Sequence, residues 1–158
     1  MSFASALDRE ALRFLREARI GHLATARANG APSVVPVCFV AEPPHVFTVI
    51  DAKPKSVEPA ELRRVRDLTE NPQAALVVDR WDEDWSRLGY VLLRGRVGLI
   101  QDGPVHQQAL ALLRRKYELY RAMGLERALV IDLHIESHHR WGDLSRPQFS
   151  ASPLGSAI

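Results

Sequence analysis

The chain has 158 residues, of which 46% are hydrophobic and 25% are charged, and its formal net charge is +2. This length and balance predict one domain with a buried core and exclude wholesale disorder. The surplus of cations is small, and acids are interspersed among them (Asp82, Glu83 and Asp84 follow Arg80). The sequence therefore argues against a dedicated nucleic-acid binder.

The single cysteine, Cys38, excludes an internal disulfide, and its apolar neighbours predict a small buried core residue. Such cysteine usage is typical of a reducing, cytoplasmic location. The first residues lack a basic segment followed by an apolar one, so we expect no secretory signal. No apolar run approaches the roughly 20 residues that span a bilayer, so we expect a soluble protein without a membrane partner.

The first predicted element is an amphipathic helix over residues 5–18, with Ser5 as its N-cap. A strand over 21–27 follows, and Asn29-Gly30 predicts a hairpin turn because both residues tolerate positive φ. The return strand is expected over 32–41. Pro32 and Pro36 cannot donate to a ladder, which favours a sheet edge or a bulge for this strand.

A third strand over 45–50 leads into a basic connection and a helix over 59–71, in which Pro59 suits the first helical position. Five cations gather along this stretch: Lys53, Lys55, Arg63, Arg64 and Arg66. A helix N-terminus with cations around it suits an anion, and a phosphate most of all. A solvated basic surface without a ligand is the alternative.

Strands are then predicted over 74–79, 90–100 and 128–141, with a helix over 105–122. Gly95 and Gly98 would permit a bulge or a barrel corner in the second of these strands. Six strands, mostly in hairpin order, predict a mainly β fold: a small antiparallel barrel with peripheral helices. We expect one domain over 1–144 and a flexible tail over 145–158.

No motif in the sequence identifies a catalytic side chain. Ser33 and Ser56 lack the context of a nucleophile, and the glycine motifs of nucleotide-binding loops are missing from the sequence. His134, His138 and His139 invite a metal interpretation. In a regular strand, however, the first two lie on one face about 13 Å apart, too far to share a metal. We therefore predict neither catalytic nor metal-binding residues, which fits a protein whose bound cofactor carries the chemistry.

The three tryptophans could lie in the core, at an interface or against a bound ring, and the first two are the commoner uses. They are Trp81, Trp85 and Trp141.

Four stretches together resemble the pyridoxamine 5'-phosphate oxidase-like flavin-binding split barrels. They are IGHLATARANGAPSVVPVCF, FTVIDAKPKS, LRRVRDLTENPQAALVVDRW and DEDWSRLGYVLLRGRVGLI. More narrowly, the chain is similar to the actinobacterial branch regarded as using the deazaflavin coenzyme F420. The resemblance covers about residues 7–141 and implies an FMN-binding split barrel of six or seven strands.

The resemblance also implies cofactor-binding positions. It sets Ser33, Val35 and Pro36 along the cofactor ring and linker, and Thr48, Ile50 and Asp51 against it from the third strand. It sets Lys53, Lys55 and Arg64 at the cofactor phosphate, with Arg63 close by. Arg80, and Trp141 or His139 from a partner subunit, are further candidates. The chain departs from the family at Asp67, where many members have asparagine.

The resemblance implies an oxidoreductase that moves a hydride between F420 and a small organic substrate, in a homodimer with cofactor sites at the interface. One alternative keeps the fold and uses FMN, as in a pyridoxamine phosphate oxidase. The other is a non-catalytic carrier of F420 or haem. His134, His138 and His139 are the residues that would favour haem.

Overall fold

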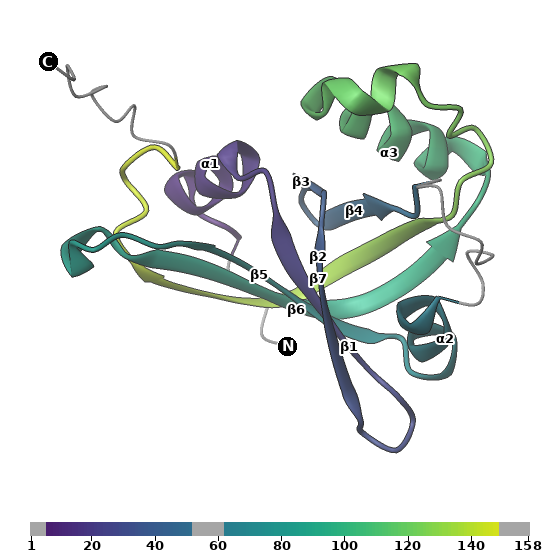
Figure 1. Ribbon diagram of the computed structural model, residues 1–158, viewed down its shortest axis with the longest axis horizontal. Coiled ribbons are helices and arrows are strands. Elements are labelled where there is room, and N and C mark those ends of the chain that lie inside the picture. The colour runs from purple at the N-terminus through teal and green to yellow at the C-terminus, as the bar shows by residue number, and fades with distance from the viewer. Residues whose placement is uncertain (1–5, 52–61, 149–158) are drawn as a thin grey trace, which may run out of the picture.

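The computed structural model describes residues 6–51 and 62–148, which form one curled antiparallel sheet flanked by helices (Figure 1). Seven strands pair in the order β2-β1-β5-β6-β7-β4-β3. Their bounds are β1 Gly21–Ala26, β2 Pro32–Val37, β3 Val40–Glu42, β4 His45–Val49, β5 Gln73–Arg80, β6 Gly89–Ile100 and β7 Val130–Gly142. The helices are α1 Arg9–Glu17, α2 Arg63–Glu70 and α3 Gly103–Lys116, with the short 3-10 segments η2 Trp85–Arg87 and η3 Glu118–Ala122. The predicted mainly β class with peripheral helices is confirmed.

The single strand predicted over 32–41 is wrong, because it is two strands at opposite ends of the sheet. β2 pairs with β1, and β3 pairs with β4. Only Cys38 and Phe39 separate them, so the two ends of the sheet adjoin along the chain. The edge position predicted from Pro32 and Pro36 is confirmed, since β2 ends the sheet.

The seam between these two ends is called the split. β3 pairs with β4 only from His45 to Phe47. The next residues of β4, Thr48 and Val49, pair with β7 on their other side. Within the described residues, β2 and this last part of β4 thus each have one edge without a strand partner. Backbone N–H and C=O groups along such edges are open to a ligand.

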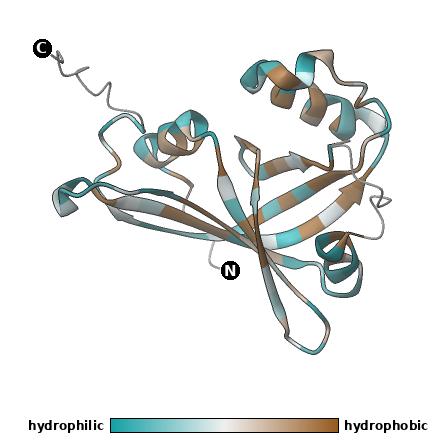
Figure 2. Cartoon of the chain, in the orientation of Figure 1, coloured by the Kyte–Doolittle hydropathy of each residue, from teal (hydrophilic) through white to brown (hydrophobic). Residues whose placement is uncertain are grey.

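Two hydrophobic clusters hold the sheet in this curl (Figure 2). The larger one fills the barrel interior and joins Phe14 and Leu15 of α1 to residues from β1, β5, β6 and β7. The second lies between α3 and the outer side of β4, where Phe47 and Leu113 are fully buried. α2 contacts β1 instead, near the split. None of the helices in the described part of the chain is long and apolar enough to cross a membrane.

Two predicted helix ends are wrong. α1 begins at Arg9 because the Asp8 carboxylate accepts a hydrogen bond from the Ala11 N–H at 2.8 Å and so caps the helix; Ser5 lies outside the described residues. α3 ends at Lys116 instead of continuing to residue 122. Tyr117 is extended (φ −117°, ψ 112°), and its hydroxyl bonds to the backbone of Phe39, which pulls it out of the helical path.

A β-bulge in β7 separates the histidines that the sequence analysis had placed on one face. Arg94 pairs with Ser137 and Gly95 with Ile135, so Glu136 is the extra residue. Such a bulge reverses the alternation of side chains beyond it. His138 therefore pairs with the buried Leu93, while His134 pairs with the exposed Arg96. The bulge expected at Gly95 is confirmed.

Candidate cofactor site at the split of the barrel

α2 is tied to the β1–β2 side of the split through Asp67, which is only 1% exposed. Its carboxylate accepts a hydrogen bond from the Thr25 hydroxyl at 3.0 Å. Two guanidinium groups approach it as well, Arg27 at 3.7 Å and Arg63 at 3.8 Å. A buried carboxylate needs such partners. Thr25 and Arg27 hold α2 against the end of β1, whereas Arg63 belongs to α2 itself. Arg63 is exposed and engaged by Asp67.

Arg64, the next residue along α2, has different surroundings. Its side chain is half-buried, and its Nε is buried with no hydrogen-bond partner within the described residues. Burial lowers the pKa of the Arg64 guanidinium, and the nearby Asp51 carboxylate and Tyr120 oppose that shift. An arginine remains a cation despite such a shift. Arg64 is thus a partly desolvated positive charge with unused hydrogen-bonding capacity.

The carboxylate of Asp51, which follows β4, lies near enough to Arg64 for its charge to act on the guanidinium. One of its oxygens accepts a hydrogen bond from the Tyr120 hydroxyl at 3.2 Å. Tyr120 lies in η3 and is 2% exposed, and burial raises the pKa of its hydroxyl, so it stays a neutral donor. The preceding Tyr117 packs edge-on against it at 5.5 Å between ring centroids. The hydroxyl of Tyr117 accepts from the Phe39 N–H at 3.0 Å. These two tyrosines therefore fix both the β2–β3 linker and the exit of β4.

The N-terminus of α2 faces the same region. Its N-cap residue is Leu62, which supplies no side-chain hydrogen bond. Arg66 is the first residue whose N–H bonds to the N-cap carbonyl. The N–H groups before it belong to the first turn, which has no partners inside the helix and carries the positive end of its dipole. Together with Arg64, they form a positively polarised corner beside the split.

The strand residues implied by the resemblance fall into two groups. Ser33 and Val35 face the inner side of β2, whereas Pro36 is exposed on its outer side, because side chains alternate along a strand. Thr48 and Ile50 are 6% and 4% exposed and point into the barrel. These two residues can offer a ligand mainly backbone groups. Lys53 and Lys55 lie outside the described residues.

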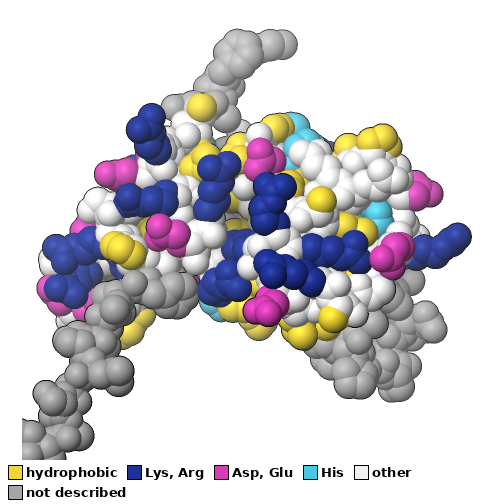
Figure 3. Space-filling model, turned by 90° about the horizontal axis from the view of Figure 1, so that it is seen from above, with side chains coloured by type: hydrophobic (Ala, Val, Ile, Leu, Met, Phe, Trp, Pro, Cys, Tyr) yellow, Lys and Arg dark blue, Asp and Glu magenta, His cyan; other side chains and the backbone are white. Residues whose placement is uncertain are grey.

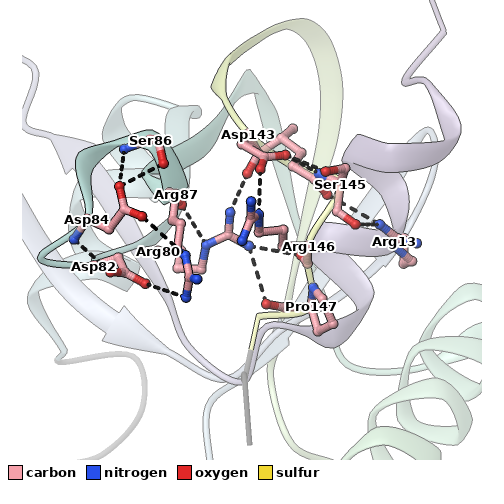
Figure 4. Close-up of polar contacts among 11 residues, drawn as sticks. Arg13, Arg80, Asp82, Asp84, Ser86, Arg87, Asp143, Ser145, Arg146 and Pro147 are labelled. Atoms are coloured by element: carbon pink, nitrogen blue, oxygen red, sulfur yellow. Dashed lines mark hydrogen bonds and ion pairs between the residues drawn. The ribbon is translucent and has the colours of Figure 1, made fainter. Parts of the chain in front are cut away.

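Arg80 is not at the split but at the far end of the barrel, where its guanidinium bonds to backbone carbonyls (Figure 4). Nε donates to Arg87 at 2.8 Å and Nη1 to Arg146 at 2.9 Å, and Nη2 donates to Asp143. These bonds anchor the segment after β7. Ser145 and Gln148 in that segment bond to Arg13 and Phe14 of α1.

Trp141 lies on the outer face of the sheet at the end of β7, away from the part of that face that α3 covers at β4 (Figure 1). Its ring stacks on Tyr90, with centroids 5.8 Å apart, yet half of its surface is exposed. His139 lies next along this face, beside Tyr90. All three tryptophans are at least 50% exposed, so none is a core residue. An open hollow of about 560 Å³ indents this face, and its lining includes Ala24, Ala26 and Ala75 together with Arg94 and Arg96.

Several of the remaining cations are surface charges that lie near carboxylates. On the face that carries α1 and α3, arginines and lysines alternate with carboxylates (Figure 3). Arg16 lies 3.7 Å from Glu42, and Arg114 lies 3.1 Å from Glu126. No group of three or more potential metal ligands occurs in the described residues.

The curled, split antiparallel sheet with peripheral helices defines a split β-barrel. The family model for pyridoxamine 5'-phosphate oxidase matches residues 7–141, and the chain belongs to that family. A comparison with curated proteins finds no match.

Solved structures share the fold at low sequence identity. The haem storage protein HutZ from Vibrio cholerae is 19% identical, with a TM-score of 0.67, over 87% of this chain and 95% of that one. A conserved hypothetical protein from Mycobacterium tuberculosis is 12% identical, with a TM-score of 0.70, over 99% and 97%. A candidate pyridoxamine 5'-phosphate oxidase from Lactobacillus delbrueckii is 20% identical, with a TM-score of 0.57, over 84% and 93%.

Sequence reasoning missed Tyr120 altogether. Tyr120 is 69 residues from Asp51, in a stretch predicted to continue a helix, and no local pattern links the two. Asp67 was noticed only as a departure from the family, although its place opposite Thr25 and Arg27 makes it the anchor of α2. Both residues bond across the fold, which a pattern along the chain does not reveal.

Proposed function

We propose that the chain binds a flavin-type cofactor along the split, with the cofactor phosphate at the N-terminus of α2. The observation that carries this proposal is Arg64: a half-buried guanidinium with a buried Nε that has no partner among the described residues. A phosphate would supply the missing acceptor and the balancing charge. Lys53 and Lys55 are proposed as further phosphate ligands.

The proposed cofactor is coenzyme F420, with FMN as the alternative. When bound, either one would supply the hydride chemistry of an oxidoreductase acting on a small organic molecule. The residues of this chain would bind and orient it: backbone groups of β2 and of the end of β4 along the ring, and cations at the phosphate. Ser33 and Val35 remain proposed contacts of the ring and linker, together with Thr48, Ile50 and the backbone of Asp51.

The two lysines provide the first test. Replacing both (Lys53→Ala with Lys55→Ala) should weaken cofactor binding by a few kcal/mol, because charge-assisted hydrogen bonds contribute about 1.5–3 kcal/mol each. Fluorescence titration would give the affinity, and circular dichroism would check that the fold persists. Equal affinity in the double variant and the unaltered chain would mean that these lysines are solvated surface charges.

We further propose a homodimer in which the outer face of the sheet forms the interface. Two rows of side chains cross five strands on that face: Pro36, His22, Val77, Leu92 and His139 in one, and Val34, Ala24, Ala75, Arg94 and Ser137 in the other. Most of them are apolar or small, and Val34 is 62% exposed. Such a face suits a second protein surface. In this dimer, Trp141 or His139 of one subunit would reach the other's cofactor.

A haem carrier is the second candidate, because HutZ and a haem-binding protein from Mycobacterium smegmatis share the fold. His138 and His139 lie on opposite faces of β7, so at most one of the two could face a given haem. Added haem should give a Soret band that survives gel filtration if this function holds. Loss of the band during filtration would exclude it.

A further inference from the structure

The Tyr120–Asp51 hydrogen bond lies near Arg64 of α2. Arg64 makes no ion pair with the described residues, although its neighbour Arg63 pairs with Asp67. The Asp51 carboxylate is close enough for its charge to act on Arg64. An aspartate free to move would be drawn onto such a half-desolvated guanidinium.

The Asp51 carboxylate instead accepts a hydrogen bond from the Tyr120 hydroxyl. The distance from the hydroxyl to Oδ2 of Asp51 is 3.2 Å, and the ring that carries it is 2% exposed and packed on Tyr117. A donor fixed by a buried ring has little freedom to follow its acceptor. The position of Asp51 is therefore set from η3, across the fold from α2.

We infer that Tyr120 is a positioning residue of the anion site: its hydroxyl holds Asp51 back, so that the Arg64 guanidinium stays available to an anionic ligand. This inference rests on the proposed function, since it assigns a second layer to the same phosphate site. It also changes the role of Asp51, which becomes a competitor for Arg64 that Tyr120 restrains.

Three variants test this with FMN and coenzyme F420 as the probes. Tyr120→Phe removes only the hydroxyl, and Asp51 should then pair with Arg64. Affinity for the cofactor that binds the unaltered chain should fall by about tenfold, the loss of one charged hydrogen bond. Adding Asp51→Asn to the same chain should restore affinity to within about threefold, because the amide carries no charge to compete. Asp51→Asn alone should bind at least as tightly as the unaltered chain.

Tyr117→Phe is the matched control. Its hydroxyl is also buried in this cluster but bonds to the backbone of Phe39 and Arg19, so affinity should stay unchanged. Thermal unfolding of every variant would separate lost binding from lost fold. If Tyr120→Phe does not fold, Asp51→Asn alone still decides the question, since weaker binding there contradicts the inference.

The outcomes separate the two claims. No binding of either probe by the unaltered chain would overturn the proposed function and this inference with it. Binding that depends on Arg64, but that Tyr120→Phe leaves intact or Asp51→Asn does not rescue, would overturn the inference alone.

Discussion

Arg63 and Arg64 are adjacent in the sequence, yet the fold gives them different tasks. Arg63 is exposed and pairs with Asp67, which anchors α2 to β1. Arg64 is half-buried near Asp51, and its buried Nε has no hydrogen-bond partner within the described residues. The sequence shows the cluster of cations, but it does not show which arginine pairs with an aspartate and which one is left for a ligand. That difference depends on two aspartates from different elements. Asp67 of α2 pairs with Arg63, and Asp51 after β4 lies near Arg64.

Replacement of Arg64 should therefore affect binding far more than replacement of its neighbour on the exposed side. Arg64→Ala should weaken cofactor binding by about tenfold or more, because a charged hydrogen bond contributes about 1.5–3 kcal/mol. Arg66→Ala, at an exposed position of the same helix, is the matched control and should change affinity little. Equal losses in the two variants, measured by fluorescence titration, would point to long-range charge instead of a specific contact.

Lys116 makes the stability of the fold depend on pH. Burial, with the neighbouring Arg19 charge second, lowers the pKa of this lysine from 10.5 to about 7. Its Nζ lies over the Phe39 ring at 4.0 Å and donates to the Leu15 carbonyl at 3.3 Å. Between about pH 7 and pH 10.5, the unfolded chain binds a proton at this site that the folded chain does not. The free energy of unfolding should therefore rise with pH across this range.

Urea unfolding at pH 6 and pH 9 would measure this effect. Lys116→Met keeps the apolar stem without the charge, so the part of the pH dependence due to this lysine should disappear. The variant should gain most stability at pH 6, where the buried charge costs the unaltered chain most. A variant with the same rise between pH 6 and pH 9 as the unaltered chain would show that Lys116 is charged and solvated.

At the scale of elements, periodicity predicted all three helices and located the strands to within a few residues. The errors have two kinds of cause, a single side chain that sets a helix end and the curl of the whole sheet. Asp8 caps α1 three residues after the predicted N-cap, and Tyr117 ends α3 early because its hydroxyl is needed at Phe39. The division of β2 from β3 also depends on the curl of the whole sheet. No local pattern contains that information.

The bulge between β6 and β7 requires glycine at position 95. A Cβ there would overlap the carbonyl oxygen of His134, whereas a Cβ at Gly98, three residues along the same strand, would meet open space. Gly95→Ala should lower the free energy of unfolding by about 1–3 kcal/mol, the usual cost of overpacking. Gly98→Ala is the control and should be nearly neutral. Similar unfolding midpoints for the two variants would contradict this account of the bulge.

At the scale of the whole molecule, we expect the outer face of β2, β1, β5, β6 and the end of β7 to join two copies of the chain in a dimer. Val34→Glu places a charge on the proposed interface at its β2 edge and should shift the mass measured by light scattering from two chains to one. Val105→Glu, at a partly exposed position on α3, is the control and should leave the dimer intact. A single-chain mass for the unaltered protein would contradict the proposed dimer directly.

The family could be inferred from the order and spacing of its motifs, and the fold followed from it. The cofactor could not, because F420 and FMN would place a phosphate at the same basic corner and differ in a ring that backbone groups contact. A likeness to haem-binding proteins of the same fold does not decide the matter either.

Parallel titration of the purified protein with coenzyme F420 and FMN tests the central claim most directly. We predict saturable binding of F420 with an affinity in the micromolar range, weaker binding of FMN, and binding of both that is about tenfold weaker or more in Arg64→Ala. Saturation by FMN alone would move the protein to the flavin branch of its family. Binding of neither cofactor would contradict the proposed site.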